Sequence, residues 1–170
     1  LPLIEDGLYR CLVSEKELLS LSGSKSTVGE AVLFAPSVTE SNHLLEALAL
    51  VARYKLSFLP VILPSGEYVG GITSDGLLNA ISDFTNAEAE GSIIMLEVLP
   101  LDYSLSDIAR LVESNHSHII SMLSHTDKVT GRLLISIKID LEDASPVIRS
   151  FERFNYTVLY YFMKKGMVED

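Results

Sequence analysis

An internal repeat is the feature that most restricts how this chain folds. The stretch LPLIEDGLYRCLVSEKELL (residues 1–19) aligns with LPVILPSGEYVGGITSDGLL (residues 59–78) with one gap in the turn. The leading Leu-Pro, a tyrosine and the closing Leu-Leu match identically, and Ser14 aligns with Thr73. Two copies of a short unit predict two equivalent substructures that fold together.

Each copy has the composition of a β-hairpin followed by a helix. Two short apolar runs flank a turn, Asp6-Gly7 in the first copy and Pro64-Ser65-Gly66 in the second, and an apolar helical start follows. A further helix, capped by Ser41 or Asn42 and ending near Tyr54, precedes the second copy. The second unit is therefore expected to be β-α-β-β-α, over about residues 27–84.

A different periodicity follows the polar residues 85–91, which we interpret as a linker. Strands are expected over 92–98, 118–125, 132–140 and 157–162, and helices over 104–115 and from Ser145-Pro146 onwards. Ser104 and Asp107 have the spacing of a capping box. The order βαββαβ is that of the ferredoxin-like fold, so the whole chain is predicted to be α+β.

The charge and the cysteine content exclude several classes of protein. A net charge of −10 and a pI near 4.8 argue against a nucleic acid partner, which needs clustered Lys and Arg. No apolar run approaches the ~20 residues of a membrane span. Cys11 is the single cysteine, so no internal disulfide is possible. We expect a cytoplasmic protein with neither a nucleic acid nor a membrane as partner.

The second copy resembles a CBS domain, a small module that occurs in tandem pairs. The resemblance rests on SFLPVI (57–62), the turn, and the pattern of Gly, two apolar residues, Ser or Thr, two variable residues, an acidic residue and two apolar residues. It implies that residues 23–84 are one CBS unit and residues 1–22 the C-terminal part of its partner. The missing front half and the missing initial Met suggest a fragment of a longer chain.

The CBS resemblance implies a cleft that binds an adenine nucleotide or S-adenosylmethionine as a regulatory ligand. A hydroxyl and backbone N–H groups at a helix N-terminus suit phosphate oxygens, and a carboxylate suits ribose hydroxyls. The residues implied are Ser14, Glu17, Val38, Phe58, Leu59, Pro60, Thr73 and Asp75. The alternative is that Ser74 or Asp75 only caps the following helix while Thr73 ends a strand.

Residues 92–163 are most similar to an ACT domain, which binds amino acids and other small effectors, and residues 164–170 form a tail. The similarity rests on Asp102, Leu105 and the helix IARLVE leading into NHSHI. It implies an effector site at Asp102, Tyr103 and Ser104, although Asp102 and Tyr103 can instead shape a turn. A CBS pair followed by an ACT domain is known in small bacterial proteins, including acetoin-utilisation-type CBS proteins.

Other reactive side chains do not form a recognisable site. His116 and His118 can point the same way if the strand starts early, but His125 is expected to face the opposite side, so we predict no metal site. Cys11 has no flanking signature of a nucleophile. The sequence therefore predicts a non-catalytic regulatory module without a cofactor, and the two resemblances imply a homodimer. The alternative is a structural or dimerisation protein with degenerate ligand sites.

Overall fold

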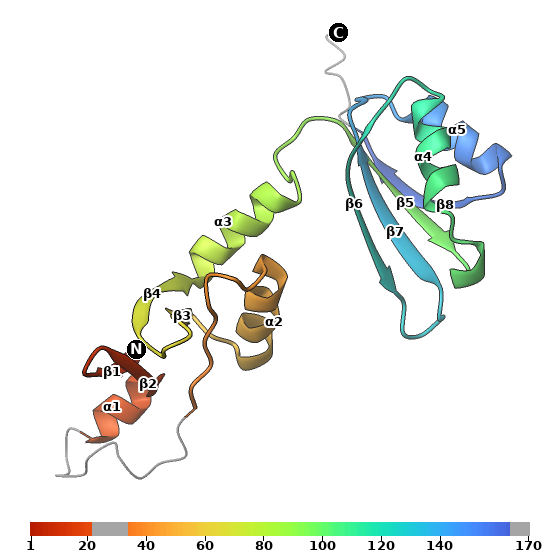
Figure 1. Ribbon diagram of the computed structural model, residues 1–170. Coiled ribbons are helices and arrows are strands. Elements are labelled where there is room, and N and C mark those ends of the chain that lie inside the picture. The colour runs from red at the N-terminus through yellow and green to blue at the C-terminus, as the bar shows by residue number, and fades with distance from the viewer. Residues whose placement is uncertain (22–33, 164–170) are drawn as a thin grey trace, which may run out of the picture. The chain divides into compact units, whose positions relative to one another are not determined.

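The computed structural model describes residues 1–21 and 34–163. The chain divides into two compact units, unit 1 (Leu1–Phe84) and unit 2 (Thr85–Asp170). Both units combine helices with antiparallel strands (Figure 1), so the predicted α+β class is confirmed.

Unit 1 contains two hairpins of the same design, each followed by a helix. The first consists of β1 (Pro2–Glu5), β2 (Leu8–Leu12) and α1 (Glu15–Leu21). The second consists of β3 (Phe58–Ile62), β4 (Tyr68–Thr73) and α3 (Ser74–Phe84). Each hairpin is a separate two-stranded antiparallel sheet. The repeat in the sequence is therefore a repeat in the structure.

Two reciprocal backbone hydrogen bonds join the hairpins at their turns. The Tyr9 N–H donates to the Gly66 carbonyl at 3.0 Å, and the Tyr68 N–H donates to the Gly7 carbonyl at 2.9 Å. These residues are equivalent in the repeat, so the two turns face each other in a locally two-fold arrangement. Gly7 and Gly66 have φ of +79° and +88°, values that glycine adopts without a steric penalty.

Helix α2 (Leu44–Tyr54) precedes the second hairpin, but its cap differs from the prediction. The imidazole Nδ1 of His43 accepts the Leu45 N–H at 3.1 Å, and the Glu46 carboxylate accepts the His43 N–H at 2.7 Å. The predicted cap, Ser41 or Asn42, is wrong because the Asn42 side chain accepts the Thr39 N–H in the preceding turn. A neutral imidazole supplies an acceptor that the usual preference for Ser, Thr, Asp and Asn overlooks.

The first strand expected in the β-α-β-β-α unit is represented by Val38 alone, since residues 22–33 lie outside the described ranges. Val38 pairs in parallel with Val61: its N–H donates to Pro60 at 3.0 Å, and its carbonyl accepts the Ile62 N–H at 2.9 Å. The core of unit 1 takes one residue from this segment and one each from α2, β3 and α3, namely Val38, Ala47, Leu59 and Leu77. These four residues hold the helices against the second hairpin.

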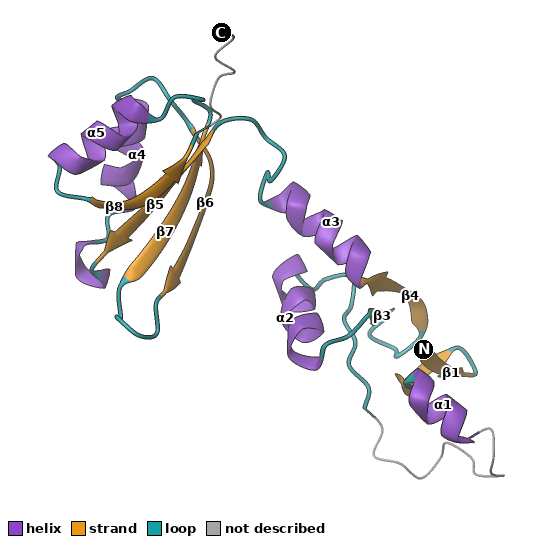
Figure 2. Ribbon diagram, turned by 180° about the vertical axis from the view of Figure 1, so that it is seen from behind, coloured by secondary structure: helices purple, strands orange, loops and turns teal. Residues whose placement is uncertain are grey.

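Unit 2 has the βαββαβ order of a ferredoxin-like fold. Its elements are β5 (Ser92–Val98), the short 3-10 helix η2 (Pro100–Asp102), α4 (Leu105–Glu113), β6 (Ile119–Thr126), β7 (Leu133–Ile139), α5 (Ser145–Arg153) and β8 (Thr157–Phe162). The strands form one antiparallel sheet in the order β6-β7-β5-β8. Figures 1 and 2 show α4 and α5 side by side against one face of this sheet. The predicted ferredoxin-like fold is confirmed.

Alternation along the strands determines which face of the sheet the helices cover. The buried side chains of β5 and β7 on that face are Ile94, Leu96, Val98, Ile135, Ile137 and Ile139. They pack against buried side chains of the two helices, namely Ile108, Leu111, Val112, Val147, Ile148 and Phe151. This core is much larger than that of unit 1, so we expect unit 2 to gain more stability from apolar burial.

Phe154 departs from the expected pattern of α5. In the sequence, Val147, Ile148, Phe151 and Phe154 have the spacing of one buried helix face, whereas the Phe154 side chain is 45% exposed. Residue 154 lies just beyond the last helical residue, so it no longer follows the helical period. Its ring instead contacts the guanidinium groups of Arg110 and Arg153, whose Cζ atoms lie 5.2 and 5.3 Å from its centroid.

Lys138 is buried on the face of β7 opposite the core, which is unusual for a lysine side chain. Its Nζ donates to the carbonyls of Asn86 at 2.7 Å and Ala87 at 2.9 Å. These two acceptors replace water around the ammonium group. They also hold the segment between α3 and β5 against the sheet of unit 2.

Asp140 connects the end of β7 to the start of β6. Its carboxylate accepts the Ser117 hydroxyl at 2.8 Å and the His118 N–H at 2.7 Å, and it lies 2.8 Å from the His118 imidazole. Hydrogen bonds, first from the His118 N–H and then from the Ser117 hydroxyl, lower the pKa of Asp140 to about 2.

Within the described ranges, no helix is long and apolar enough to cross a membrane.

Substitution of Gly91 is expected to destabilise unit 2. Gly91 has φ of +133°, and a Cβ atom there would overlap the Ile139 carbonyl oxygen. We expect Gly91→Ala to lower the free energy of unfolding by about 2–4 kcal/mol. Gly131→Ala is the control: it has φ of +69° but open space around it, and should cost about 1 kcal/mol. Urea unfolding, with hydrogen exchange of β5 and β7 amides, measures both; equal losses would contradict the predicted clash.

The contribution of Asp140 to stability should depend on pH. Because folding lowers its pKa from 3.8 to about 2, the stabilisation is complete above about pH 4 and is lost as the pH falls through 2. Asp140→Asn should therefore reduce the stability of unit 2 at neutral pH, and the difference from wild type should shrink between pH 4 and 2. Urea unfolding at a series of pH values measures this difference. A difference that stays constant over that range would contradict the assignment.

Candidate functional site

Unit 1 contains a pocket of about 620 Å³, which we call the unit-1 pocket. It is lined by residues 1–2, 12–15, 34 and 54–58. The lining therefore combines the end of the first hairpin with the end of α2 and the start of β3. A volume of this size is within the range of small-molecule sites.

The segment 34–38 brings these parts of unit 1 together. The Leu12 N–H donates to the Phe34 carbonyl at 2.9 Å, and the Tyr9 hydroxyl donates to the Pro36 carbonyl at 3.1 Å. Burial, followed by the charge of Cys11, raises the pKa of Tyr9 to about 12, so its hydroxyl stays protonated as a donor. Because Val38 pairs with β3, one segment holds the first hairpin beside the second.

The unit-1 pocket offers aromatic walls and a few polar groups. Phe34 and Tyr54 meet edge to face, with ring centroids 4.9 Å apart, and Phe58 lies in the same lining. Lys55 supplies the cationic group; it adopts φ of +53° and its N–H donates to the Val51 carbonyl at the end of α2. Hydroxyls come from Ser14 and Ser57, and a carboxylate from Glu15. Such a lining can contact both a planar ring and an anionic group.

The residues predicted for the CBS cleft take different positions. Ser14 and Phe58 lie in the lining of the unit-1 pocket. Val38, Leu59 and Pro60 are buried and are not among its lining residues in the described ranges. The side chain of Glu17 lies outside the described part of the structure. Thr73 and Asp75 are exposed at the start of α3, and Thr73 is the strand partner of Phe58.

The corner at Thr73 caps a helix. The Thr73 hydroxyl oxygen accepts the Gly76 N–H at 3.0 Å, so the residue capping α3 is Thr73 rather than Ser74 or Asp75. A Cβ atom at Gly76 would lie 3.1 Å from the same oxygen. The glycine therefore leaves the space that this hydrogen bond occupies. Asp75 lies in the first turn of α3, where a negative charge interacts favourably with the helix dipole.

Sequence reasoning missed most residues of the unit-1 pocket, among them Phe34, Tyr54, Lys55 and Ser57. The sequence predicted that α2 ends near Tyr54, and this was the available signal for Tyr54, Lys55 and Ser57. No pattern indicated that the end of a helix would face the first hairpin. That proximity results from the hydrogen bonds of segment 34–38, which join residues distant in sequence.

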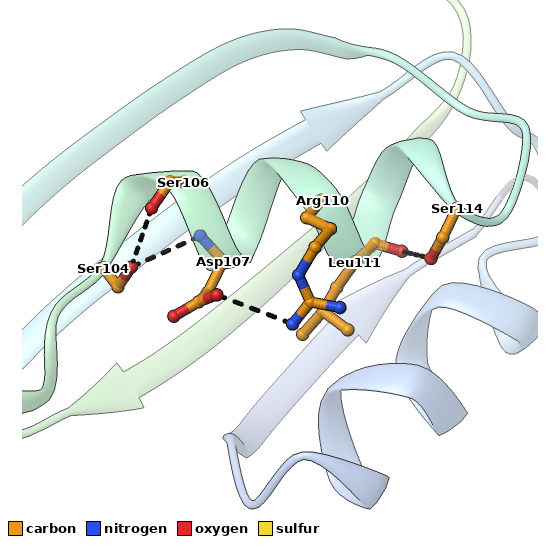
Figure 3. A network of polar contacts seen from close by, with 6 residues as sticks. All are labelled: Ser104, Ser106, Asp107, Arg110, Leu111 and Ser114. Carbon is orange, nitrogen blue, oxygen red and sulfur yellow. Dashed lines mark hydrogen bonds and ion pairs between the residues drawn. The ribbon is translucent and has the colours of Figure 1, made fainter.

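Unit 2 contains a second pocket, of about 400 Å³, which we call the unit-2 pocket. Its lining carries charges of both signs: Glu97, Asp102, Asp107, Arg110 and Arg132. Arg110 lies 3.5 Å from Asp107, and Arg132 lies 3.4 Å from Glu97. Figure 3 shows Asp107 and Arg110 directed toward each other along α4.

The predicted effector residues of unit 2 are separated by their local roles. Asp102 lines the unit-2 pocket, whereas Tyr103 and Ser104 are not among its lining residues in the described ranges. The Ser104 hydroxyl oxygen accepts the Asp107 N–H at 3.3 Å and so caps α4 (Figure 3). Of the predicted capping box only this half is formed, because the Asp107 carboxylate pairs with Arg110.

The histidines and the cysteine occupy structural positions. His118 pairs with Asp140, as described above, and His125 is exposed on β6. In the portion that the structure describes, no three His, Cys, Asp or Glu side chains could together hold a metal ion. Cys11 is buried in unit 1.

Comparison with known proteins identifies a family within unit 1. A family model for the CBS domain matches residues 34–83. No curated protein matches the chain. The crystal structure of CBSX2 in complex with AMP is 25% identical, covering 49% of this chain and 71% of that one, with a TM-score of 0.41. That of protein BT0572 from Bacteroides thetaiotaomicron is 14% identical, covering 72% and 86%, with a TM-score of 0.33.

The position of Phe58 in the pocket wall should depend on Gly71. A Cβ atom at residue 71 would overlap the ring of Phe58, whereas residue 70 has open space around it. We expect Gly71→Ala to displace the ring and to cost about 1–3 kcal/mol of stability, and Gly70→Ala to cost less. In a Phe58→Ala background the cost of Gly71→Ala should largely disappear. Urea unfolding of the four variants tests this; a cost that persists without the ring would contradict it.

Proposed function

Because residues 34–83 form a CBS domain, we propose that the chain is a non-catalytic regulatory module that senses a small ligand. The unit-1 pocket is the proposed site. The observation that carries the proposal is that this pocket joins elements of both copies of the repeat, so a bound molecule contacts both hairpins. A ligand that contacts both copies favours the arrangement in which they are together, which is how occupancy shifts an equilibrium.

The chemistry of the lining supports an adenine nucleotide or S-adenosylmethionine as the ligand class. Phe58 and the Phe34–Tyr54 pair provide apolar surface for a planar base. Lys55 provides a cation, and Ser14 and Ser57 provide hydroxyls beside it. In a chain of net charge −10, a local cation is needed to offset the repulsion of an anionic ligand. In this proposal Lys55 binds the phosphate or carboxylate, and Ser14 contacts the sugar.

A second candidate function is the binding of an amino acid type effector in the unit-2 pocket, as in an ACT-like domain. The observation that favours it is the mixed charge of the lining, which suits a zwitterion: Arg110 and Arg132 can face a carboxylate, and Asp102 an ammonium group. Both arginines already have carboxylate partners, at 3.5 and 3.4 Å, and a ligand must compete with those ion pairs. We therefore rank this site below the unit-1 pocket.

Ligand binding can be tested by calorimetry with AMP, ATP and S-adenosylmethionine, and separately with a set of amino acids. A ligand at a hundred times its dissociation constant should raise the free energy of unfolding by about 2.7 kcal/mol, which a melting scan also detects. Lys55→Gly removes the cation and keeps a residue that tolerates the positive φ. It should weaken nucleotide binding about tenfold or more.

The matched control is Lys128→Ala, which removes the same charge from the exposed residues before β7 in unit 2. It should leave nucleotide affinity unchanged. Equal weakening by both substitutions would mean that net charge, and not the unit-1 pocket, determines binding. If no ligand of either class gives heat or a thermal shift at millimolar concentration, the sensor proposal fails. The structural or dimerisation role with degenerate sites then becomes the better account.

A further inference from the structure

A further pocket of unit 2, of about 410 Å³, lies where the end of α4 meets α5. Asn115, which follows α4, lines one side of it, and α5 supplies Pro146, Arg149, Ser150 and Arg153. These residues of α5 recur at intervals of three and four positions, so they share one face of the helix. They line neither the unit-1 pocket nor the unit-2 pocket, and we call this separate site the arginine pocket.

The two arginines of this pocket carry positive charges that no carboxylate neutralises in the described part of unit 2. Arg110 and Arg132, the other arginines of the unit, each have a carboxylate partner. Arg149 and Arg153 are exposed and form no ion pair with any described residue. Like charges four positions apart on a helix repel each other. An anion bound between the two guanidinium groups removes this repulsion.

Acidic residues next to the pocket are engaged elsewhere. The Asp143 carboxylate accepts the Ser145 N–H at 2.9 Å, at the start of α5. Hydrogen bonds from the Ser145 hydroxyl and N–H lower the pKa of Asp143, and the charge of Arg149 adds a smaller effect. Glu152 directly precedes Arg153, so it lies about 100° around the helix from it. Arg149 and Arg153 therefore remain available to an anion from solution.

A hydrogen-bonded pair forms the base of the arginine pocket. The Asn115 Nδ2 donates to the Leu111 carbonyl at 2.7 Å and to the Ser150 hydroxyl oxygen at 2.9 Å, which ties the end of α4 to α5. Ser150 is only 8% exposed, and because its oxygen accepts this bond, its O–H group can donate to a bound oxyanion. The Arg153 guanidinium lies 5.3 Å from the centroid of the Phe154 ring. This contact restricts the side chain and reduces the entropy lost on binding.

We propose that the arginine pocket binds the phosphate monoester group of a small molecule, with Arg149 and Arg153 on either side of the phosphoryl oxygens. A phosphate monoester carries a charge of about −1.5 to −2 at pH 7, which matches two guanidinium groups. Each planar guanidinium presents paired N–H donors whose geometry suits phosphate oxygens. The volume of about 410 Å³ suits a small molecule. The proposal is independent of the ligand proposed for the unit-1 pocket.

Titration of the isotope-labelled full chain with methyl phosphate, followed by NMR at low ionic strength, tests the proposal. The amides of Asn115 and of residues 147–153 should shift together. The dissociation constant should be millimolar, because the probe contains only the anionic group and one methyl group. Methyl sulfate has the same shape and a single negative charge, so it should bind at least about fivefold more weakly.

Substitutions in the arginine pocket should weaken the binding of methyl phosphate. Arg149→Gln and Arg153→Gln each remove one cation and should raise the dissociation constant about tenfold. Arg149→Lys keeps the charge without the paired donors, so its effect should be intermediate. The matched control is Arg53→Gln, which removes an exposed arginine of α2 that lines none of the three pockets and should leave the affinity unchanged. Urea unfolding of each variant shows that the fold is retained.

Several outcomes overturn the proposal. One is the absence of shifts at residues 115 and 147–153 at tens of millimolar methyl phosphate. Equal affinity for methyl sulfate would mean that the pocket does not select a phosphate monoester. Equal weakening by Arg53→Gln would attribute binding to net charge. Shifts confined to unit 1 and abolished by Lys55→Gly would assign the phosphate to the unit-1 pocket, which removes this proposal and supports the nucleotide proposal. Shifts at residues 147–153 that persist in Lys55→Gly support the arginine pocket whatever the outcome in unit 1.

Discussion

Two backbone hydrogen bonds between the turns of the hairpins are the contacts on which the candidate site depends. Tyr9 bonds to Gly66 and Tyr68 bonds to Gly7, so the two bonds are equivalent to each other in the repeat. An isolated two-stranded hairpin is at best marginally stable in water, so each copy needs the other or a helix against it. With the hairpins joined in this way, the hydrogen bonds of segment 34–38 place the end of the first hairpin beside the end of α2 and so form the unit-1 pocket. The pocket is thus a consequence of the way in which the repeat becomes stable.

Unit 2 stabilises its strands in a different way. Its four strands form one sheet, and two helices bury the apolar side chains of one face. The core is therefore built from residues of unit 2 alone. On the opposite face, Lys138 and Glu97 have partners within the same unit.

The sequence predicted the elements better than it predicted the site. Strand β7 was clear because Ile135, Ile137 and Ile139 alternate with polar residues, and a period of two is set by strand geometry alone. Ser14 and Phe58 were expected in a ligand cleft because the resemblance to a CBS domain implies them, and both lie in the lining of the unit-1 pocket. Lys55 and Phe34 were not, because their place in the pocket follows from hydrogen bonds between distant segments. The roles of His43 and Lys138 were not predicted, because their partners, a backbone N–H and two carbonyls, leave no trace in the residue pattern.

The distance in sequence between the two turns affects how unit 1 is made in the cell. Roughly sixty residues separate Tyr9 from Tyr68, and ribosomes add roughly 5–20 residues per second, so the first hairpin emerges several seconds before its counterpart exists. During that interval its backbone groups at the turn have only water as a partner. In unit 2, β5 and β8 pair across a similar distance along the chain, since Ile93 pairs with Phe162 and Glu97 with Thr157. A cell that makes this protein must protect a half-built first unit while the second copy of its own motif is still being translated.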